Sequence, residues 1–112
     1  MSLDNQFTFH GRLTHDPVVA ITPSNKTVTT IEIAVDASYK DAGGKKVEKV
    51  NFFRLQAWGD IGENAAKFLT KGATINVCGS INNNFYEKQG MRVYEQDFVI
   101  EEIKYRSKKK TD

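Results

Sequence analysis

The sequence has little cysteine and proline and no long hydrophobic run. Its one cysteine, Cys78, excludes an internal disulfide and a cysteine-rich zinc site. No apolar stretch approaches the roughly 20 residues of a membrane-spanning helix, and residues 1–6 have neither the basic residues nor the apolar core of a signal peptide. With 112 residues, of which 39% are hydrophobic and 27% charged, the chain has the size and composition of one folded domain. We therefore expect a single cytoplasmic domain with no membrane segment.

The net charge of +2 is distributed unevenly along the chain. Residues 104–112 contain five basic residues and one acidic residue, which leaves a net charge of −2 for the other 103 residues. Total charge therefore does not indicate nucleic-acid binding, and such a claim must rest on where individual charges lie. We expect residues 1–105 to form the domain and residues 106–112 to form a short, basic, disordered tail.

Apolar and polar residues alternate in several short segments, which is the pattern of half-buried β-strands. In the first segment, Phe7–Leu13, every second residue is apolar or glycine, whereas Thr8, His10 and Arg12 share the other face. Turn-forming residues such as Asp16-Pro17 separate the segments. The pattern predicts a short continuation of the first strand at 18–21 and further strands at 28–39, 47–58, 73–86 and 92–105.

One segment, residues 60–71, has a helical pattern instead. Its apolar residues, which recur at i, i+4, i+7 and i+8, are Ile61, Ala65, Phe68 and Leu69. Asp60 and Glu63 have the spacing of a capping box at the start of a helix, and Gly72 suits the left-handed position after its end. The sequence predicts a short helix here.

The order of these elements is three strands, one helix and two more strands. A helix of about three turns cannot bury its apolar stripe alone, and five strands leave exposed edges unless they curl into a barrel. A helix over the open end of a closed barrel buries its apolar stripe against the barrel, and closure of the barrel leaves no strand edge exposed. The sequence therefore predicts an all-β fold, a five-stranded OB barrel with one short helix between strands 3 and 4, whose strand 2–3 face commonly binds nucleic acid or sugar. Cys78 is expected to be buried, and Gly79 to mark a bulge.

Residue parity along the third strand divides its side chains between the two faces. Phe53, Leu55 and Ala57 can fill the barrel, so the alternate residues must face outward. These outward residues are Phe52, Arg54, Gln56 and Trp58. Two large aromatic rings and an arginine on one outer face exceed what solubility requires, and a cluster of this kind indicates an interaction surface.

Four aromatic residues and a set of cations fall on this face or in its loops. The aromatic residues are Tyr39 at the end of the second strand, Phe52 and Trp58 on the third, and Tyr86 at the entry to the loop between strands 4 and 5. The cations around them are Lys40, Lys45, Lys46, Lys49, Arg54, Lys88 and Arg92. Unpaired bases present π faces for stacking while their phosphates require positive charge, so this mixture indicates a single-stranded nucleic acid. The alternative is that these aromatic residues pack in the core or at a subunit interface.

Several motifs in this order resemble the bacterial single-stranded DNA-binding protein family. They are Gly11-Arg12-Leu13 followed by Asp16-Pro17, Phe52-Phe53-Arg54-Leu55, Trp58-Gly59, the segment 65–72, and Val77-Cys78-Gly79-Ser80-Ile81. The resemblance covers residues 7–105 and implies that Tyr39, Phe52, Trp58 and Tyr86 stack on DNA bases, with Tyr39 at a position where the family often has tryptophan. It also implies a homotetramer, or at least a dimer, in which the first strands pair across the interface and His10 lies within it.

The end of the sequence departs from the family pattern. Typical bacterial members continue through a glycine-rich linker to an acidic tip that recruits replication and repair enzymes, whereas this sequence ends in Lys108-Lys109-Lys110-Thr111-Asp112. Either the acidic segment has been removed or the chain is a short member, as from a phage or mobile element. The resemblance therefore does not extend to recruiting replication or repair proteins.

Two other classes of function compete with this interpretation. The acidic pairs Glu95/Asp97 and Glu32/Asp36 raise the possibility of a metal-dependent nuclease, but the sequence has no catalytic motif beside them. Because a fold does not fix its ligand, a primosomal-type module that bridges proteins, or an RNA- or oligosaccharide-binding domain, is the other alternative. We expect a protein that is not an enzyme, needs no cofactor or metal, and binds single-stranded DNA with little sequence preference to protect it during replication, recombination or repair.

Overall fold

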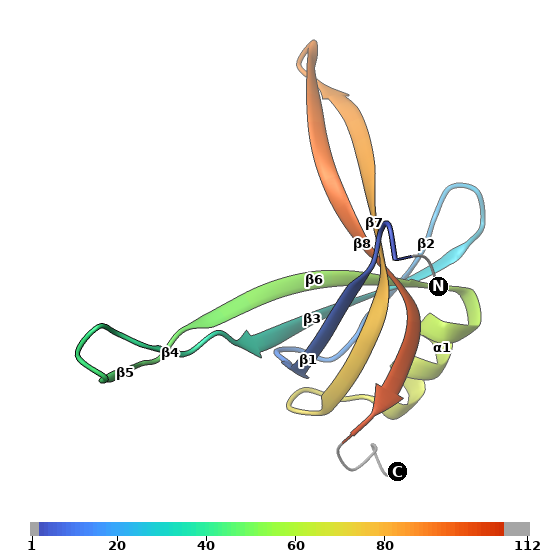
Figure 1. Ribbon diagram of the computed structural model, residues 1–112. Helices are drawn as coiled ribbons and strands as arrows, with labels where there is room; N and C mark the ends of the chain where they lie inside the picture. Colours follow the sequence, from blue (N-terminus) through green and yellow to red (C-terminus); the bar gives the residue numbers. More distant parts are fainter. Residues whose placement is uncertain (1–2, 107–112) are drawn as a thin grey trace.

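The computed structural model describes residues 3–106, which contain eight strands and one helix (Figure 1). The elements in chain order are β1 (Phe7–Leu13), β2 (Val18–Ile21), β3 (Thr27–Asp36), β4 (Tyr39–Lys40), β5 (Lys46–Val47), β6 (Val50–Trp58), α1 (Gly59–Phe68), β7 (Thr74–Lys88) and β8 (Met91–Tyr105). Within the described part of the chain, no helix is long and apolar enough to cross a membrane.

Five of the strands close into a barrel. The main sheet has the order β1-β7-β8-β6-β3-β2, and an additional pairing of β1 with β3 joins its ends, so that β1, β7, β8, β6 and β3 form a ring. The β6–β8 pairing is parallel, with Leu55 opposite Phe98, and the other pairings are antiparallel. β2 adds a short edge strand outside β3. The predicted five-stranded OB barrel with one helix is thus confirmed.

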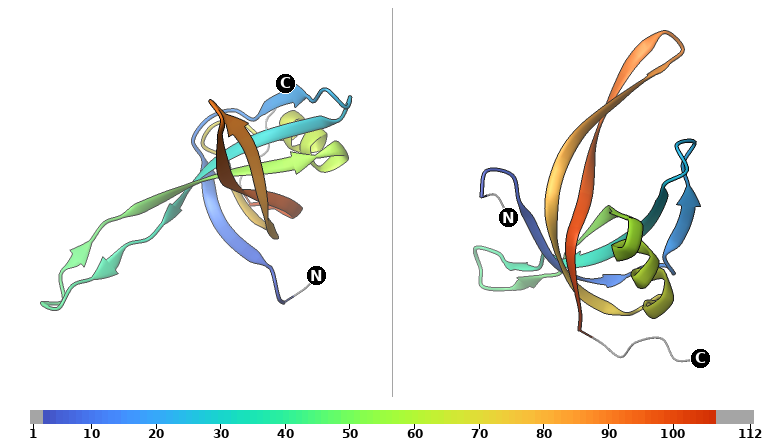
Figure 2. Two further views of the ribbon diagram at one scale, coloured as in Figure 1. Left: turned by 90° about the horizontal axis from the view of Figure 1, so that it is seen from above. Right: turned by 90° about the vertical axis from the view of Figure 1, so that its right-hand side faces the viewer.

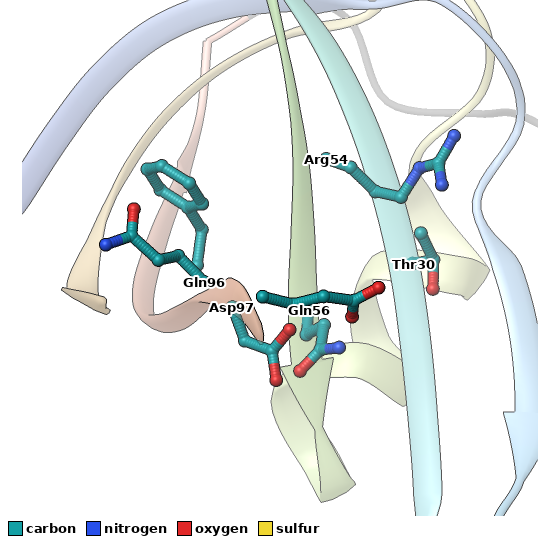
Figure 3. A pocket seen from close by; sticks show the side chains of 7 residues that line it. Thr30, Arg54, Gln56, Gln96 and Asp97 are labelled. Atoms are coloured by element: carbon teal, nitrogen blue, oxygen red, sulfur yellow. The ribbon is translucent and has the colours of Figure 1, made fainter. Parts of the chain in front are cut away.

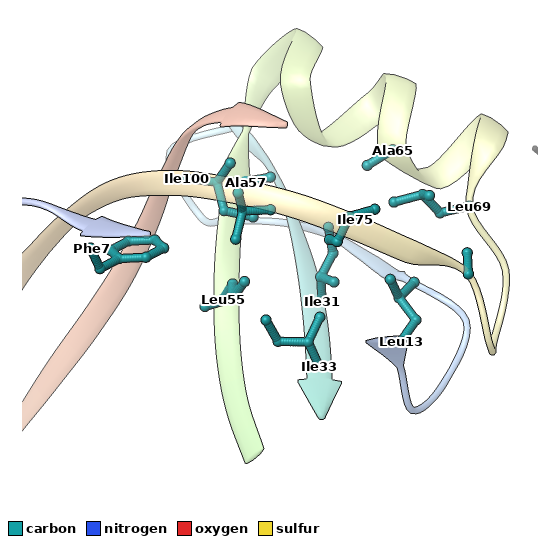
Figure 4. Packing of buried hydrophobic residues seen from close by; sticks show 12 residues of the cluster. Phe7, Leu13, Ile31, Ile33, Leu55, Ala57, Ala65, Leu69, Ile75 and Ile100 are labelled. Atoms are coloured by element: carbon teal, nitrogen blue, oxygen red, sulfur yellow. The ribbon is translucent and has the colours of Figure 1, made fainter. Parts of the chain in front are cut away.

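The barrel interior is filled by the apolar half of each alternating strand (Figure 4). Ile31 and Ile33 of β3 face Leu55 and Ala57 of β6, and all four side chains are buried. Burying a side chain as large as leucine or isoleucine contributes roughly 1.5–3 kcal/mol. Because this burial requires one face of each strand to point inward, the opposite face of β6 must point to solvent.

The helix packs against the barrel but begins and ends earlier than the sequence predicts. Its N-cap is Trp58, which makes no side-chain capping hydrogen bond, so the predicted capping by Asp60 is wrong. β6 runs directly into α1 because Gly59 takes a positive φ of 59° that permits the abrupt change of direction. At the other end Leu69 leaves the helical conformation and is buried in the core. Gly72 does adopt a left-handed conformation, in a turn where its N–H donates to the Leu13 carbonyl at 2.9 Å.

Two long hairpins project from the barrel in different directions (Figures 1 and 2). One is formed by the ends of β3 and β6 with the small β4–β5 sheet, and the other by the outer halves of β7 and β8. The second hairpin closes in a two-residue turn at Gln89-Gly90, with φ values of 52° and 77°, as in the type I′ turns that suit the twist of a hairpin. The loop predicted at 87–91 is therefore shorter, and the strands longer, than expected.

The irregularity predicted at Gly79 is present, but its extra residue is on the partner strand: Cys78 pairs with Glu102 and Gly79 with Ile100, so Glu101 of β8 is the bulged residue. The register of β7 against β8 shifts between Cys78 and Gly79, and a Cβ atom at Gly79 would lie 1.8 Å from the carbonyl oxygen of Val99. Cys78, in contrast, is not fully buried as predicted. It lies on the outer face of β7, between the buried positions Val77 and Gly79, and lines a shallow surface pocket with Glu102.

Candidate nucleic-acid interface

The outer face of the β3–β6 pair presents a series of cross-strand neighbours to solvent. Phe52 lies opposite Ala34 and Trp58 lies opposite Val28, and cross-strand neighbours share a face. The Phe52 side chain is 63% exposed and that of Trp58 is 38% exposed, so both rings point to solvent as residue parity predicts. Six residues along one strand separate the rings by roughly 20 Å. The face can therefore present two well-separated rings to one extended ligand.

Phe52 has a cation near it that the sequence analysis did not include. β1 pairs with β3 at Arg12 and Ala34, and Ala34 in turn pairs with Phe52, so the three side chains form one row across the sheet. The small Ala34 between them leaves the Phe52 ring uncovered. Arg12 is exposed and lines a surface pocket together with Lys46 of β5. The alternation of β1 could have identified Arg12, because it places Arg12 on the outer face of the strand while the next residue, Leu13, is buried.

Arg54 lies between the two rings but is not a free cation. Its Nη2 atom is 3.7 Å from Oε2 of Glu32, the residue opposite it on β3. The other Glu32 oxygen accepts a hydrogen bond of 2.8 Å from Thr14 Oγ1 and lies 3.7 Å from His15 Nδ1. Because ion pairs at an exposed surface contribute little energy, a phosphate can compete with Glu32 for the guanidinium.

Between β6 and β8 the surface is hollowed into a polar pocket of about 460 Å³ (Figure 3). Thr30, Arg54 and Gln56 line it from β3 and β6, and Glu95, Gln96, Asp97 and Phe98 line it from β8. The two carboxylates make this wall of the surface unfavourable for phosphate. The opposite wall combines the uncharged donor and acceptor groups of Thr30 and Gln56 with the guanidinium of Arg54.

Trp58 lies at the end of β6 beside a second cation that the sequence analysis missed. Lys26, at the end of the turn between β2 and β3, lines one surface pocket together with Trp58 and Glu63. The turn itself is shaped by Asn25, whose φ of 65° places it in the left-handed region. The Lys26 position could not be inferred from alternation, because it depends on how this turn folds back on the sheet.

The first hairpin holds one predicted ring and four predicted lysines away from the barrel. Tyr39 is 54% exposed and pairs with Val47, and Lys40 pairs directly with Lys46. Lys45, in the turn, and Lys49, at the base, are exposed as well. Two like charges directly across a strand pair repel each other, so an anion bound between Lys40 and Lys46 is stabilised.

The base of this hairpin is ordered by Asp36. Its Oδ1 atom accepts a hydrogen bond of 2.9 Å from the Ser38 backbone N–H. The pKa of Asp36 is lowered from its ordinary value by hydrogen bonds from the Ser38 side chain and backbone, to which the charge of Lys46 adds. The ionised Asp36 carboxylate thus fixes the point at which β3 enters the hairpin.

The second hairpin separates residues that the sequence analysis placed together. Tyr86, which is 43% exposed, pairs with Val93, whereas Arg92 pairs with Glu87. Successive residues of a strand point to opposite faces, so Arg92 lies on the face opposite Tyr86. The sequence analysis placed Arg92 on the binding face or in its loops, near Tyr86; in the structure it projects from the other face of this hairpin. Lys88, which pairs with Met91, does share the Tyr86 face.

Two exposed aromatic residues of this hairpin, Phe85 and Tyr94, were not among the predicted site residues. They are cross-strand neighbours on the Arg92 face. Within residues 3–106, no group of three or more histidine, cysteine, aspartate or glutamate side chains is placed to hold a metal ion.

A closed five-stranded barrel with exposed rings and cations across its β3–β6 face is the architecture of OB-fold binding proteins. The sequence model that describes the Single-strand binding protein family matches residues 4–105 of this chain. The chain belongs to this family. The resemblance noted in the sequence is thus confirmed.

Two curated relatives illustrate the similarity. Single-stranded DNA-binding protein 1 of Lactococcus lactis subsp. lactis (strain IL1403) is 36% identical over 108 residues, which are 96% of this chain and 71% of that protein. Single-stranded DNA-binding protein 1 of Streptococcus agalactiae serotype III (strain NEM316) is 35% identical over 98 residues, which are 87% of this chain and 59% of that protein. Both relatives are longer than the chain described here.

Solved structures show the same fold. The crystal structure of a deletion mutant of the single-stranded DNA binding protein from Thermus aquaticus has a TM-score of 0.81 at 26% identity, over 92% of this chain and 50% of that chain. The Plasmodium falciparum SSB complex with ssDNA has a TM-score of 0.80 at 19% identity, over 96% of this chain and 97% of that chain. The second likeness, at this identity, concerns the fold alone.

Proposed function

We propose that this chain binds single-stranded DNA with little sequence preference and protects it during replication, recombination or repair. The observation that carries the proposal is the outer face of β6, where the exposed rings of Phe52 and Trp58 flank Arg54. Membership of the Single-strand binding protein family supports the choice of ligand. The cytoplasmic location expected from the sequence belongs to the same proposal.

Bases stack on the exposed rings while cations meet the phosphates. Stacking contributes roughly 1–3 kcal/mol per base and accepts any base, because every base has a π face. The proposed platforms are Tyr39, Phe52, Trp58 and Tyr86. The proposed phosphate contacts are Lys40, Lys45, Lys46, Lys49, Arg54, Lys88 and Arg92, to which the structure adds Arg12 and Lys26.

The salt dependence of binding tests this division of roles. The logarithm of the binding constant for oligo(dT) should fall linearly with the logarithm of salt concentration, with a slope of about −0.7 per phosphate neutralised. Reversing the charge of one proposed contact, as in Lys46→Glu, should make this slope shallower. An affinity independent of salt, together with tighter binding of a neutral oligosaccharide, would show that the ligand is a sugar.

We also propose that the chain acts by binding alone and not as an enzyme. The relatives are named as single-stranded DNA-binding proteins. Incubating the protein with a labelled single strand and Mg²⁺ should leave the strand at full length. Progressive shortening that a Glu95→Gln, Asp97→Asn variant abolishes would instead indicate a nuclease.

We propose that copies of the chain pair through β1, giving a dimer or a homotetramer. β1 pairs with β7 from Phe7 to Arg12, but with β3 only at Arg12 and Leu13. Its second edge is therefore unpaired from Phe7 to Gly11 among the described residues, and an unpaired edge is a template for a further strand. His10 lies within this unpaired segment and is exposed, with its ring hydrogen-bonded across to Asn76 of β7 at 3.1 Å. Light scattering should give a mass of two or four chains, and a monomer mass would contradict the proposal.

The domain is proposed to comprise residues 1–105. The basic tail expected at 106–112 lies outside the described residues, apart from Arg106, which donates to Asn76 Oδ1 at 2.8 Å. Contacts with replication or repair proteins are not part of the proposal.

A further inference from the structure

The outer half of the β7–β8 hairpin has two faces of different composition. The register is constant from Ile81 opposite Phe98 to Lys88 opposite Met91, so alternate cross-strand pairs belong to opposite faces. The Tyr86 face consists of the pairs Asn82/Asp97, Asn84/Glu95, Tyr86/Val93 and Lys88/Met91. The Tyr94 face consists of the pairs Asn83/Gln96, Phe85/Tyr94 and Glu87/Arg92.

The Tyr94 face has two rings and a guanidinium in contact. The ring centroids of Phe85 and Tyr94 are 6.2 Å apart, at an interplanar angle of 47°. The guanidinium carbon of Arg92 lies 4.5 Å from the Phe85 centroid, in the position of a cation–π interaction. Phe85 is 56% exposed and Tyr94 is 69% exposed. The two rings therefore stay largely open to solvent although they contact each other.

The two faces also differ in charge. Glu95 and Asp97 of β8 lie on the Tyr86 face, closer to the barrel than Tyr86 is. Both line the pocket of Figure 3. Their carboxylates repel a phosphate backbone that approaches Tyr86 from that side. On the Tyr94 face the corresponding positions hold the neutral amides of Asn83 and Gln96, and its carboxylate, Glu87, lies opposite the positive charge of Arg92. A nucleic acid is therefore repelled less on the Tyr94 face than on the Tyr86 face.

We infer that the Tyr94 face is a second platform for single-stranded DNA, so that the bound strand contacts both sides of this hairpin. An unpaired base stacks on Tyr94 and Phe85. Arg92, whose guanidinium carbon lies over the Phe85 ring, supplies N–H donors for a phosphate beside the two rings. The inference depends on the proposed function and extends its binding surface beyond the β3–β6 face and Tyr86.

A fluorescent ring at position 94 tests contact directly. Trp58 is the one tryptophan in the sequence, so in a Trp58→Phe background the added substitution Tyr94→Trp makes position 94 the only emitter. Saturating oligo(dT) should quench that emission. The control is Phe68→Trp in the same background, because Phe68 is an exposed ring on α1, outside the proposed binding surface; its emission should not change.

Truncation of the rings tests their contribution to binding. The double substitution Phe85→Ala, Tyr94→Ala should leave a short oligo(dT) bound to the β3–β6 face unaffected. It should weaken a longer oligo(dT) roughly tenfold or more, and reduce the number of nucleotides bound per chain. Tyr94→Phe, which keeps the ring, should bind like the original protein. Both rings are largely exposed, so thermal unfolding should be nearly unchanged in both variants.

The failure of this inference can be distinguished from failure of the proposed function. If Trp58→Ala weakens binding while the double variant changes neither affinity nor nucleotides per chain, and position 94 is not quenched, the second platform is wrong and the proposed function stands. If neither Trp58→Ala nor the double variant weakens binding, both aromatic platforms are wrong. If the original protein does not bind oligo(dT), the proposed function itself fails. If the double variant lowers the mass in solution and leaves binding per chain intact, this face joins copies of the chain and the inference is overturned.

Discussion

At the scale of single residues, exposure of the rings on β6 follows from parity alone. Leu55 and Ala57 are completely buried, so the residues between and beside them must point outward. What parity could not reveal is the environment of each outward group. Arg54 pairs with Glu32, and Phe52 lies in one row with Arg12, because of cross-strand registers that the sequence does not specify.

The exposed ring of Phe52 should contribute to binding far more than to stability. We expect Phe52→Ala to weaken oligo(dT) binding by roughly 1–3 kcal/mol, and to change the free energy of unfolding by about 0.5 kcal/mol or less, as exposed positions usually do. Val50→Ala is the matched control, because Val50 is exposed on the same strand and lies at its end. Equal losses of affinity in the two variants would contradict a specific role of the ring.

Cys78 should react slowly with thiol reagents. Burial raises the pKa of the Cys78 thiol above its ordinary value, and the carboxylates of Glu102 and Glu101 add to the shift. Because the thiolate is the reactive form, the rate of reaction with a disulfide reagent should rise at higher pH than for free cysteine. Glu102→Gln should lower the pH at which the reaction rate rises. A rate that rises at the same pH as for free cysteine, or at a lower pH, would contradict this account.

At the scale of the elements, alternation predicted the strands, and the apolar stripe predicted the helix. The start of α1 was missed because no side chain caps it: Trp58 ends β6 and Gly59 permits the change of direction. The face of Arg92 was missed for a different reason. A five-residue loop was expected at 87–91, whereas the observed two-residue turn pairs Glu87 with Arg92. A shift of one residue in register moves a side chain to the other face.

Gly79, the β7 position opposite the bulge of β8, should tolerate no side chain. An added Cβ would lie 1.8 Å from the Val99 carbonyl oxygen, so Gly79→Ala must displace backbone between β7 and β8. We expect a loss of about 1–3 kcal/mol in the free energy of unfolding, measured with urea. The control is Gly43→Ala, where the nearest atom to an added Cβ is Asp41 Oδ1 at 3.5 Å and little change is expected. Equal stability of the two variants would contradict the tight packing at the bulge.

At the scale of the whole molecule, the barrel and its outer face could be predicted, but the positions of the hairpins could not. Tyr39 lies on the first hairpin and Tyr86 on the second, and the two hairpins leave the barrel in different directions (Figures 1 and 2). Their directions depend on how far β6, β7 and β8 continue past the barrel, and alternation continues unchanged across that boundary. The proposed binding surface therefore extends from the β3–β6 face onto both hairpins.

The central claim is that unpaired bases stack on the outward rings of the barrel face, and the native emission of Trp58 tests it most directly. Trp58 is the one tryptophan of the chain and is 38% exposed on that face. Titration with oligo(dT), with binding followed in parallel by the anisotropy of a labelled strand, should quench Trp58 emission in proportion to the bound fraction. Full binding by anisotropy with Trp58 emission unchanged would contradict the claim.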